Sequence, residues 1–352
     1  MSAQDHSARK ADHLRIAAED DVGFGNLTNG LERYRFVHQA LPEIDLDAVD
    51  TSTTLLGRKL AAPILISCMT GGVAKGGLIN RILAAAAQHA GVAIGVGSQR
   101  AALDDASLEE TFQVRELAPD VPLLANLGAA QLAEPDGIER CRAVVRMIQA
   151  DALVIHVNPL QEALQPEGTT RFAGLIDRIS AATAAIDVPI IVKEVGWGIA
   201  ENIARRLADV GIAGIDVAGS GGTNWGEVER RRMDDPVMVR VAGEFREWGI
   251  PTADSVVASR RGFPDGLIIA SGGLRTGLDA AKCLALGADA VGFAAPLLKA
   301  AVVSRRAVDE RLRGIIEGLR IAMFCIGAAT VTDLVGTPHF VHDNGNADTS
   351  RN

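Results

Sequence analysis

Short apolar runs, many of them rich in β-branched residues, recur along the chain from residue 62 onward. Eight such runs are present, at residues 62–67, 92–97, 122–127, 152–157, 189–195, 214–219, 266–272 and 290–296. Short apolar runs bounded by turn residues predict buried β-strands. Between most of them apolar residues recur three or four positions apart, as in Ile199, Ile203, Leu207 and Val210, and this spacing predicts helices with one buried face.

The alternation of strands and helices predicts a parallel sheet, because each crossover between parallel strands needs about a dozen residues or more. Eight such units close a (β/α)8 TIM barrel, which leaves no exposed sheet edge. An open doubly wound sheet is the alternative fold. The first strand-to-helix turn lacks G-x-G-x-x-G and the chain has no P-loop, and both facts favour the barrel.

The segments outside this pattern divide the chain into three regions. Residues 1–61 are polar and irregular, and we expect an arm and connector that is either solvated or folded over the barrel mouth. Residues 62–337 hold the barrel, a long connection at 219–266 with helix-like pieces at 238–248 and 253–261, and a C-terminal helix at 300–329. We expect the long connection to cover the mouth, and the apolar stripe of the last helix to pack against the barrel or a second subunit. Residues 338–352 are expected to be disordered.

Composition narrows the class of protein further. The 352 residues are 48% hydrophobic and 22% charged, with a net charge of −9 and no cluster of basic residues, so we expect neither nucleic acid nor a membrane surface as partner. No apolar run approaches the length of a membrane-spanning helix and the start lacks a signal-like segment, which predicts a cytoplasmic protein. The four cysteines are widely spaced and show no C-x-x-C, so we expect reduced thiols buried as small hydrophobes, not disulfide bridges or a metal site.

Polar residues gather where the predicted strands end. The fourth run is followed by HVNPLQE, the first by SCMTGG, the second by GSQR and the fifth by KEVG. The carboxyl ends of the strands of a (β/α)8 barrel carry its active site, whereas the barrel interior is filled with apolar side chains. The sequence therefore predicts a ligand site at this rim.

Two Ser-Gly-Gly turns indicate what the site binds. They follow the sixth and seventh strands, where glycine lets backbone N–H groups approach a phosphate that a Cβ would hold away. Tight turns without a ligand are the alternative. Because further small and polar residues face them, we expect a flavin mononucleotide, FMN. The residues assigned to it are Met69, Thr70, Gly71, Ser98, Asn126, Lys193, Ser220, Thr223, Gly272, Gly273, Arg275, Ala294 and Ala295.

A second anion site is predicted beside the first. Ser98, Gln99 and Arg100 follow the second strand near His156 and Asn158, and the basic residues of the arm could close over them; together they would suit a diphosphate. Glu162 is the carboxylate of this cluster, and Mg²⁺ commonly binds one or two carboxylates together with water and substrate phosphates. An ordinary acidic residue in the first turn of a helix is the alternative for Glu162.

These motifs, in this order and over nearly the whole chain, closely resemble those of type 2 isopentenyl diphosphate isomerases. The resemblance rests on RFVHQALPEIDLDAVDTSTTLLG, CMTGG, GVGSQR, ANLGA, HVNPLQE, VKEVGWG, SGGTNW and SGGLR. It implies an enzyme that interconverts isopentenyl and dimethylallyl diphosphate, needs FMN and Mg²⁺, and requires the flavin reduced by NAD(P)H. It also implies substrate contacts at Arg9, Lys10, Ser98, Gln99, Arg100, His156, Asn158 and Gln161, and metal binding at Glu162.

The chemistry of moving a double bond explains why a flavin would be needed. One proton must be added to an unactivated alkene and another removed, so an acid and a base must lie close to an apolar group. Gln161 is a poor acid and Glu162 would bind metal, so a reduced flavin could supply the acid–base function. We assign the catalytic positions to Gln161 and His156, add His13 to the substrate site, and expect a homo-oligomer, a tetramer or octamer. An FMN-dependent 2-hydroxy-acid oxidase or dehydrogenase, and a non-catalytic flavin-binding protein, remain as alternatives.

Overall fold

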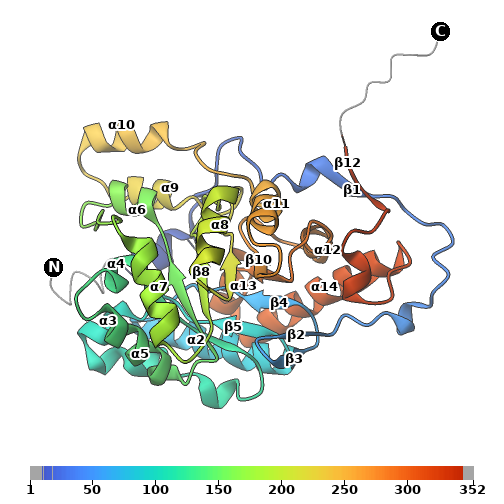
Figure 1. The fold of residues 1–352 in the computed structure, drawn as a ribbon, viewed down its shortest axis with the longest axis horizontal. Coiled ribbons are helices and arrows are strands. Elements are labelled where there is room, and N and C mark those ends of the chain that lie inside the picture. Colours follow the sequence, from blue (N-terminus) through green and yellow to red (C-terminus); the bar gives the residue numbers. More distant parts are fainter. Residues whose placement is uncertain (1–9, 11, 18, 344–352) are drawn as a thin grey trace, which may run out of the picture.

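The computed structural model describes residues 10, 12–17 and 19–343. Its centre is a closed barrel of eight strands, each hydrogen-bonded in parallel to its neighbours (Figure 1). The strands are β4 Ile64–Ile66, β5 Ala93–Gly95, β6 Leu123–Gly128, β7 Ala152–His156, β8 Ile190–Lys193, β9 Gly214–Asp216, β10 Leu267–Ala270 and β11 Ala290–Phe293. Each coincides with one of the eight apolar runs, with β6 extending one residue beyond its run, so the prediction of a (β/α)8 barrel is confirmed and the open sheet is excluded.

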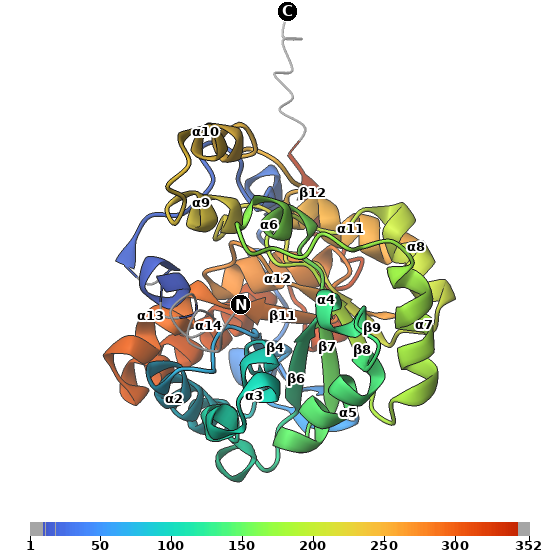
Figure 2. The same cartoon turned by 90° about the vertical axis from the view of Figure 1, so that its left-hand side faces the viewer.

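Helices surround the strands, as the view in Figure 2 shows. They are α2 Ala74–Ala90, α3 Arg100–Asp104, α4 Ala129–Leu132, α5 Gly137–Ile148, α6 Pro159–Leu164, α7 Leu175–Ala185, α8 Glu201–Asp209, α11 Thr252–Gly262, α12 Gly277–Ala285 and α13 Ala295–Val303. Short 3₁₀ helices are η1 Leu31–Arg33, η2 Leu46–Ala48, η3 Ala106–Thr111, η4 Arg115–Leu117 and η5 Val331–Leu334. Ile199 and Leu207 are buried as the helical spacing predicts, whereas Ile203 is partly exposed.

A hairpin closes the amino end of the barrel. It consists of β2 Thr53–Leu55 and β3 Arg58–Leu60, joined at Leu56 and Gly57, which both have positive φ, as tight hairpin turns require. Leu55 and Leu60 are buried against the barrel. Arg58 donates a hydrogen bond to Asp151, the residue directly before β7. The hairpin therefore lies at the end of the barrel opposite the predicted site.

The tail beyond residue 337 is partly ordered, and the prediction of disorder from residue 338 is wrong for residues 338–343. Strand β12 Phe340–His342 pairs antiparallel with β1 Tyr34–Phe36. The ring of Phe340 stacks on Tyr34 at 5.4 Å and contacts Phe36 at 4.8 Å between ring centroids. Contacts between segments that are distant in the sequence therefore hold the tail in place. The local composition of residues 338–343 does not reveal these contacts. Residues 344–352 lie outside the described residues.

The long connection after β9 folds into three helices. They are α9 Trp225–Arg230, α10 Pro236–Glu244 and α11, where two pieces had been predicted. Helix α10 begins at Pro236, after the capping residue Asp235, which is earlier than expected. Helix α9 was not predicted because it has only six residues, four of them polar or glycine. Asn224 caps the start of the helix, and its side chain accepts a hydrogen bond from the Glu227 amide.

The expected C-terminal helix is two helices, α13 and α14 Arg305–Phe324. The break falls at Ser304, whose side chain accepts a hydrogen bond from the Ala307 amide and so caps α14. The predicted apolar stripe is confirmed: Leu312, Ile315 and Leu319 are buried, and α14 packs on α12 and α2. Within the described part of the chain, no helix is long and apolar enough to cross a membrane. All four cysteines are free.

Candidate active site

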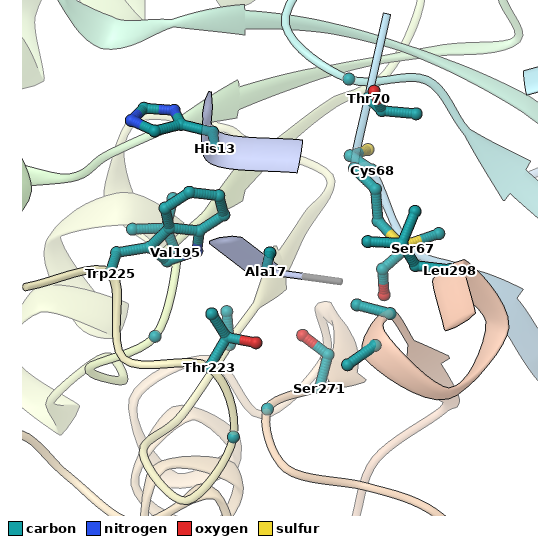
Figure 3. Close-up of a pocket in the computed structure, with 18 of the residues that line it drawn as sticks. His13, Ala17, Ser67, Cys68, Thr70, Val195, Thr223, Trp225, Ser271 and Leu298 are labelled. Atoms are coloured by element: carbon teal, nitrogen blue, oxygen red, sulfur yellow. The ribbon is translucent and has the colours of Figure 1, made fainter. Parts of the chain in front are cut away.

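A cavity of about 490 Å³ lies at the carboxyl ends of the barrel strands. Side chains from three sources surround it in Figure 3: His13 and Ala17 from the arm, Ser67, Cys68 and Thr70 after β4, and Thr223 and Ser271 after β9 and β10. Most residues assigned from the sequence line this one cavity. They are Lys10, His13, Met69, Thr70, Gly71, Ser98, Arg100, Asn126, His156, Asn158, Gln161, Glu162, Lys193, Thr223, Gly272, Gly273, Arg275, Ala294 and Ala295.

Two of the assigned residues that the structure describes, Gln99 and Ser220, do not line it. Arg9 lies outside the described residues. Gln99 is fully buried, and its side chain donates to the Val144 carbonyl and accepts from the Asn126 amide, so it supports β6 in place of the expected substrate contact. Ser220 is also fully buried, and its hydroxyl donates to the Gly196 carbonyl in place of the expected flavin contact. A polar residue at a strand end can thus point its side chain away from the mouth.

The two Ser-Gly-Gly turns pack backbone against backbone. A Cβ on Gly273, which has φ +71°, would lie 2.4 Å from the Gly221 carbonyl oxygen, and one on Gly222 would lie 2.5 Å from the Gly273 nitrogen. Only glycine allows this approach, and Gly222, Gly272 and Gly273 all face the cavity. Helix α13 begins immediately after β11, so its unpaired N–H groups also lie at this end. The residues here fit a phosphate group.

Lys193 brings a positive charge into the barrel interior. It ends β8 opposite Asp216 of β9, and its ammonium group donates to the Glu194 carbonyl at 2.5 Å. Burial raises the pKa of Asp216, although Lys193 and a hydrogen bond from Ser271 oppose that shift. Asp216 lies inside an apolar run, where the sequence pattern did not single it out. A buried cation at the carboxyl end of β8 suits the electron-rich edge of a flavin ring.

His156 is oriented by Asn126. Its Nδ1 lies 2.8 Å from Asn126 Oδ1, and because an amide oxygen only accepts, Nδ1 carries the hydrogen. The other ring nitrogen, Nε2, faces the position above Gly128, where an added Cβ would lie 3.0 Å from it. Glycine at 128 therefore leaves room for the imidazole beside the cavity.

The arm folds over the mouth in the described residues. Lys10 donates hydrogen bonds to the carbonyls of Gly71 and Ser98, at 3.0 and 2.8 Å, and its ammonium lies 5.1 Å from the centre of the Phe112 ring. The segment 12–17 is helical. Lys10, His13, Leu14 and Ala17 line the cavity, whereas Asp12 and Arg15 are exposed.

The cluster after β7 is joined by hydrogen bonds. Asn158 donates to Gln161 Oε1 at 3.1 Å and to Glu162 Oε1 at 3.0 Å, and the Thr169 amide donates to Glu162 Oε2 at 2.6 Å. Among the described residues, no group of three or more His, Cys, Asp or Glu side chains is arranged to hold a metal. Glu162 would thus be a single protein ligand, which suits Mg²⁺ held mainly by water and phosphate oxygens.

Glu229 on α9 was missed from the sequence. Its side chain is fully buried, and Oε1 accepts from Gln161 Nε2 at 2.8 Å and lies 2.9 Å from His13 Nε2, while Oε2 accepts from Arg232 at 2.7 Å. Burial alone would raise the pKa of Glu229, but its polar partners outweigh burial and lower it. The only available signal was its spacing four residues after Trp225, which places both on one face of α9.

The comparison with known proteins first identifies the class of protein to which this chain belongs. The family model for FMN-dependent dehydrogenases matches residues 3–127 and 169–342. A solved mandelate oxidase variant with (S)-mandelic acid superposes with a TM-score of 0.62 at 21% identity, covering 95% of this chain and 96% of that one. At this identity the likeness concerns the fold alone. The protein is an FMN-family (β/α)8 barrel.

More similar relatives then define the particular family. An isopentenyl-diphosphate delta-isomerase of Xanthobacter autotrophicus is 51% identical over 331 residues, covering 94% of this chain and 96% of the relative. One of Nostoc sp. is 49% identical over 333 residues, covering 95% of each. The chain belongs to the isopentenyl-diphosphate delta-isomerase family. The predictions of the family and of an isomerase are confirmed.

Proposed function

We propose that the protein interconverts isopentenyl diphosphate and dimethylallyl diphosphate by a redox-neutral shift of protons. The observation that carries the proposal is the convergence of a phosphate-fitting backbone cradle and the Asn158, Gln161 and Glu162 cluster on one cavity. Relatives with the isomerase name that are about half identical over nearly the full length support the same reaction. The 2-hydroxy-acid oxidoreductase alternative is supported by the FMN-dependent dehydrogenase family model and by fold likeness, but not by the relatives that are about half identical.

The diphosphate would bind at the arm side of the cavity. Lys10, His13, Arg100 and His156 surround that side and offer positive charge and N–H donors, and the Ser98 hydroxyl adds a neutral donor. Arg9 is a further proposed contact. In this assignment residues 1–61 serve as the arm and connector over the mouth. Glu162 would hold Mg²⁺, whose charge would offset that of the diphosphate.

The isoalloxazine ring would lie between β4 and β8, with its phosphate at the glycine cradle. Bound in reduced form, FMN would supply exchangeable protons for the acid–base chemistry, and NAD(P)H would reduce it. Lys193 and Asn126 would orient the ring edge, while Met69, Val195 and Trp225 would offer apolar surface that excludes water from the alkene. Gln161 would hold the alkene against the ring, and His156 would orient the diphosphate end.

The metal assignment is tested by Glu162→Gln. We expect loss of Mg²⁺ dependence together with most of the activity, because the amide cannot offset the metal's charge. The same change at Glu201, in the first turn of α8 on the surface, is the matched control and should leave both unchanged. An unaltered metal requirement in Glu162→Gln contradicts the assignment.

The proposed role of the flavin is tested separately. Substitution of carbon for flavin N5 should abolish turnover, and retained turnover would refute acid–base chemistry at N5.

We also propose a homo-oligomer, a tetramer or octamer, in a reducing cytoplasmic compartment. The apolar stripe of α14 is covered within the chain itself and is not available to a second subunit. Three other apolar side chains are exposed on elements that pack together and could form a subunit contact: Leu278 of α12, Ile321 of α14 and Val335 after η5. The four free cysteines agree with a reducing compartment. Light scattering coupled to gel filtration would give the number of subunits.

A further inference from the structure

Glu229 joins three segments that are far apart in the chain. The carboxylate comes from α9, Gln161 from the cluster after β7, and His13 from the N-terminal arm. Arg232, on the turn after α9, pairs with the other carboxylate oxygen and is itself near Glu167 at 3.3 Å and Asp12 at 3.9 Å. A fully buried carboxylate is retained only where such donors compensate for its lost hydration.

The charge on Glu229 determines how the Gln161 amide is turned. An ionised carboxylate can only accept hydrogen bonds, so Gln161 must direct its NH2 group toward Glu229. The amide oxygen then faces Asn158, which donates to it at 3.1 Å. A glutamine without these two partners could rotate by half a turn at little energetic cost, because the oxygen and nitrogen ends have nearly the same shape.

The same oxygen of Glu229 links this orientation to the arm. His13 Nε2 lies 2.9 Å from the same Oε1 that accepts a hydrogen bond from Gln161 Nε2, so the His13 ring contacts the carboxylate at ion-pair distance. The ring also meets the indole of Trp225 edge-on, with centroids 5.4 Å apart. Since His13 and Trp225 both line the cavity, closure of the arm and placement of the amide depend on one buried group.

We propose that Glu229 is a positioning residue for the isomerisation: it fixes the amide of Gln161 with the nitrogen turned toward α9, and it couples that orientation to closure of the arm through His13. The inference rests on the proposed function, because it assigns Gln161 to the alkene. Glu229 itself touches neither proposed ligand and acts through Gln161.

The test compares Glu229→Gln with Glu227→Gln. Glu227 lies on the same helix and is also buried, but it pairs with Arg230 and Arg231 and does not line the cavity. In Glu229→Gln the new amide can donate as well as accept, so Gln161 loses its fixed orientation. We expect kcat to fall by about 10- to 100-fold, a range typical of misplaced groups, with KM for isopentenyl diphosphate and the Kd of FMN within about threefold of wild type. In Glu227→Gln we expect kcat within about twofold of wild type. Unchanged kcat in Glu229→Gln, or an equal fall in both variants, would overturn the proposal.

A second measurement does not depend on turnover. Melting temperatures of Glu229→Gln, Gln161→Met and the double variant form a mutant cycle. If the two side chains are coupled as the geometry indicates, the shift in the double variant is smaller than the sum of the single shifts. Additive shifts would overturn the coupling. Wild-type protein that binds FMN but forms no dimethylallyl diphosphate would refute the proposed function, and the cycle would still decide whether Glu229 orients Gln161.

Discussion

The two ends of the barrel each hold a carboxylate surrounded by donors from distant segments. At the amino end, Asp151 accepts hydrogen bonds from Arg58 at 2.9 Å and Arg115 at 2.6 Å, and from the Leu123 amide at 2.8 Å. At the carboxyl end, Glu229 is held by Gln161, His13 and Arg232. The local chemistry is similar, but Gln161 and His13 line the cavity described above, whereas Arg58 and Arg115 do not.

This difference suggests that the cluster at the amino end of the barrel contributes to stability and the cluster at the carboxyl end to function. The partners of Asp151 are two arginines and a backbone amide that tie β3, η4 and β6 to the start of β7. The partners of Glu229 include Gln161 and His13, whose side chains line the cavity. Substitutions at the amino end should therefore lower stability with little effect on kcat, and those at the carboxyl end should affect ligands first.

The largest effect on ligand binding is expected at the two Ser-Gly-Gly turns, which form the proposed cradle for the FMN phosphate. In Gly273→Val, the added side chain would meet the Gly221 carbonyl at a position with φ +71°, so the two turns must separate. We expect FMN affinity to fall by more than about 100-fold, because the backbone N–H groups no longer converge on the phosphate. The same change at Gly243, where a Cβ meets nothing within 4 Å, is the control. Fluorescence titration with FMN measures both, and wild-type affinity in a folded Gly273→Val protein would contradict the cradle.

At the amino end, Asp151→Ala tests the other half of the comparison. The change leaves two arginines without their carboxylate, so we expect the free energy of unfolding to fall by about 3–5 kcal/mol with kcat unchanged at temperatures where the protein is folded. Burial alone would raise the pKa of Asp151, but the Leu123 amide and the arginines lower it. The wild-type contribution is therefore present above the unfolded-state pKa and lost as pH falls. Denaturant unfolding near neutral and acidic pH checks this, and a fall in kcat with intact stability would contradict it.

Glu194 refines the comparison between the two ends of the barrel. It lies at the carboxyl end, but its carboxylate accepts hydrogen bonds from backbone amides. Its Oε2 accepts from the amides of Val195, Gly196 and Trp197 at 2.6–2.7 Å. Burial raises the pKa of Glu194 to about 7 even though these amides and Lys193 oppose the shift. A raised folded-state pKa means that the folded protein takes up a proton. Stability from this group is thus full below the unfolded-state pKa and is lost as pH rises through about 7.

We expect wild type to lose on the order of 3 kcal/mol of stability through Glu194 between about pH 4.5 and pH 8, and Glu194→Gln to show a flatter profile. Urea unfolding at intervals of one pH unit measures the slope. An identical slope in both proteins would mean that the three amides keep the carboxylate ionised throughout.

The smallest effect on stability and kcat is expected for a substitution that lies away from both ends of the barrel. Arg306 and Glu310 form an ion pair 3.1 Å long on the surface of α14, and both are largely exposed. Because exposed pairs are screened and flexible, Arg306→Ala should shift Tm by about 1 °C or less and leave kcat unchanged. A larger shift would indicate that this face of α14 is covered, and would support a subunit contact there.

The fold could be predicted because its signal is local. All eight apolar runs contain a barrel strand, since burial on both faces of a parallel strand requires continuous apolar residues. Most polar residues at the predicted strand ends line one cavity, as expected from the sequence, and the phosphate and diphosphate assignments remain predictions.

What could not be predicted depends on contacts between distant segments. Pairing of β12 with β1 needs Tyr34 and Phe340, which are about 300 residues apart. Gln99 points into the protein and Glu229 toward Gln161, and neither direction follows from spacing along the chain. The break at Ser304 was visible in principle as a capping serine, but a continuous apolar pattern concealed it.

The most direct test of the account is turnover followed by NMR. The protein is incubated without oxygen in D₂O with FMN, NADPH, Mg²⁺ and isopentenyl diphosphate. The account predicts dimethylallyl diphosphate that carries deuterium, formed only when the flavin is reduced, with no net consumption of NADPH per turnover. Bound, reducible FMN without any product, together with flavin reduction by a 2-hydroxy acid, would contradict the isomerase and establish an oxidoreductase.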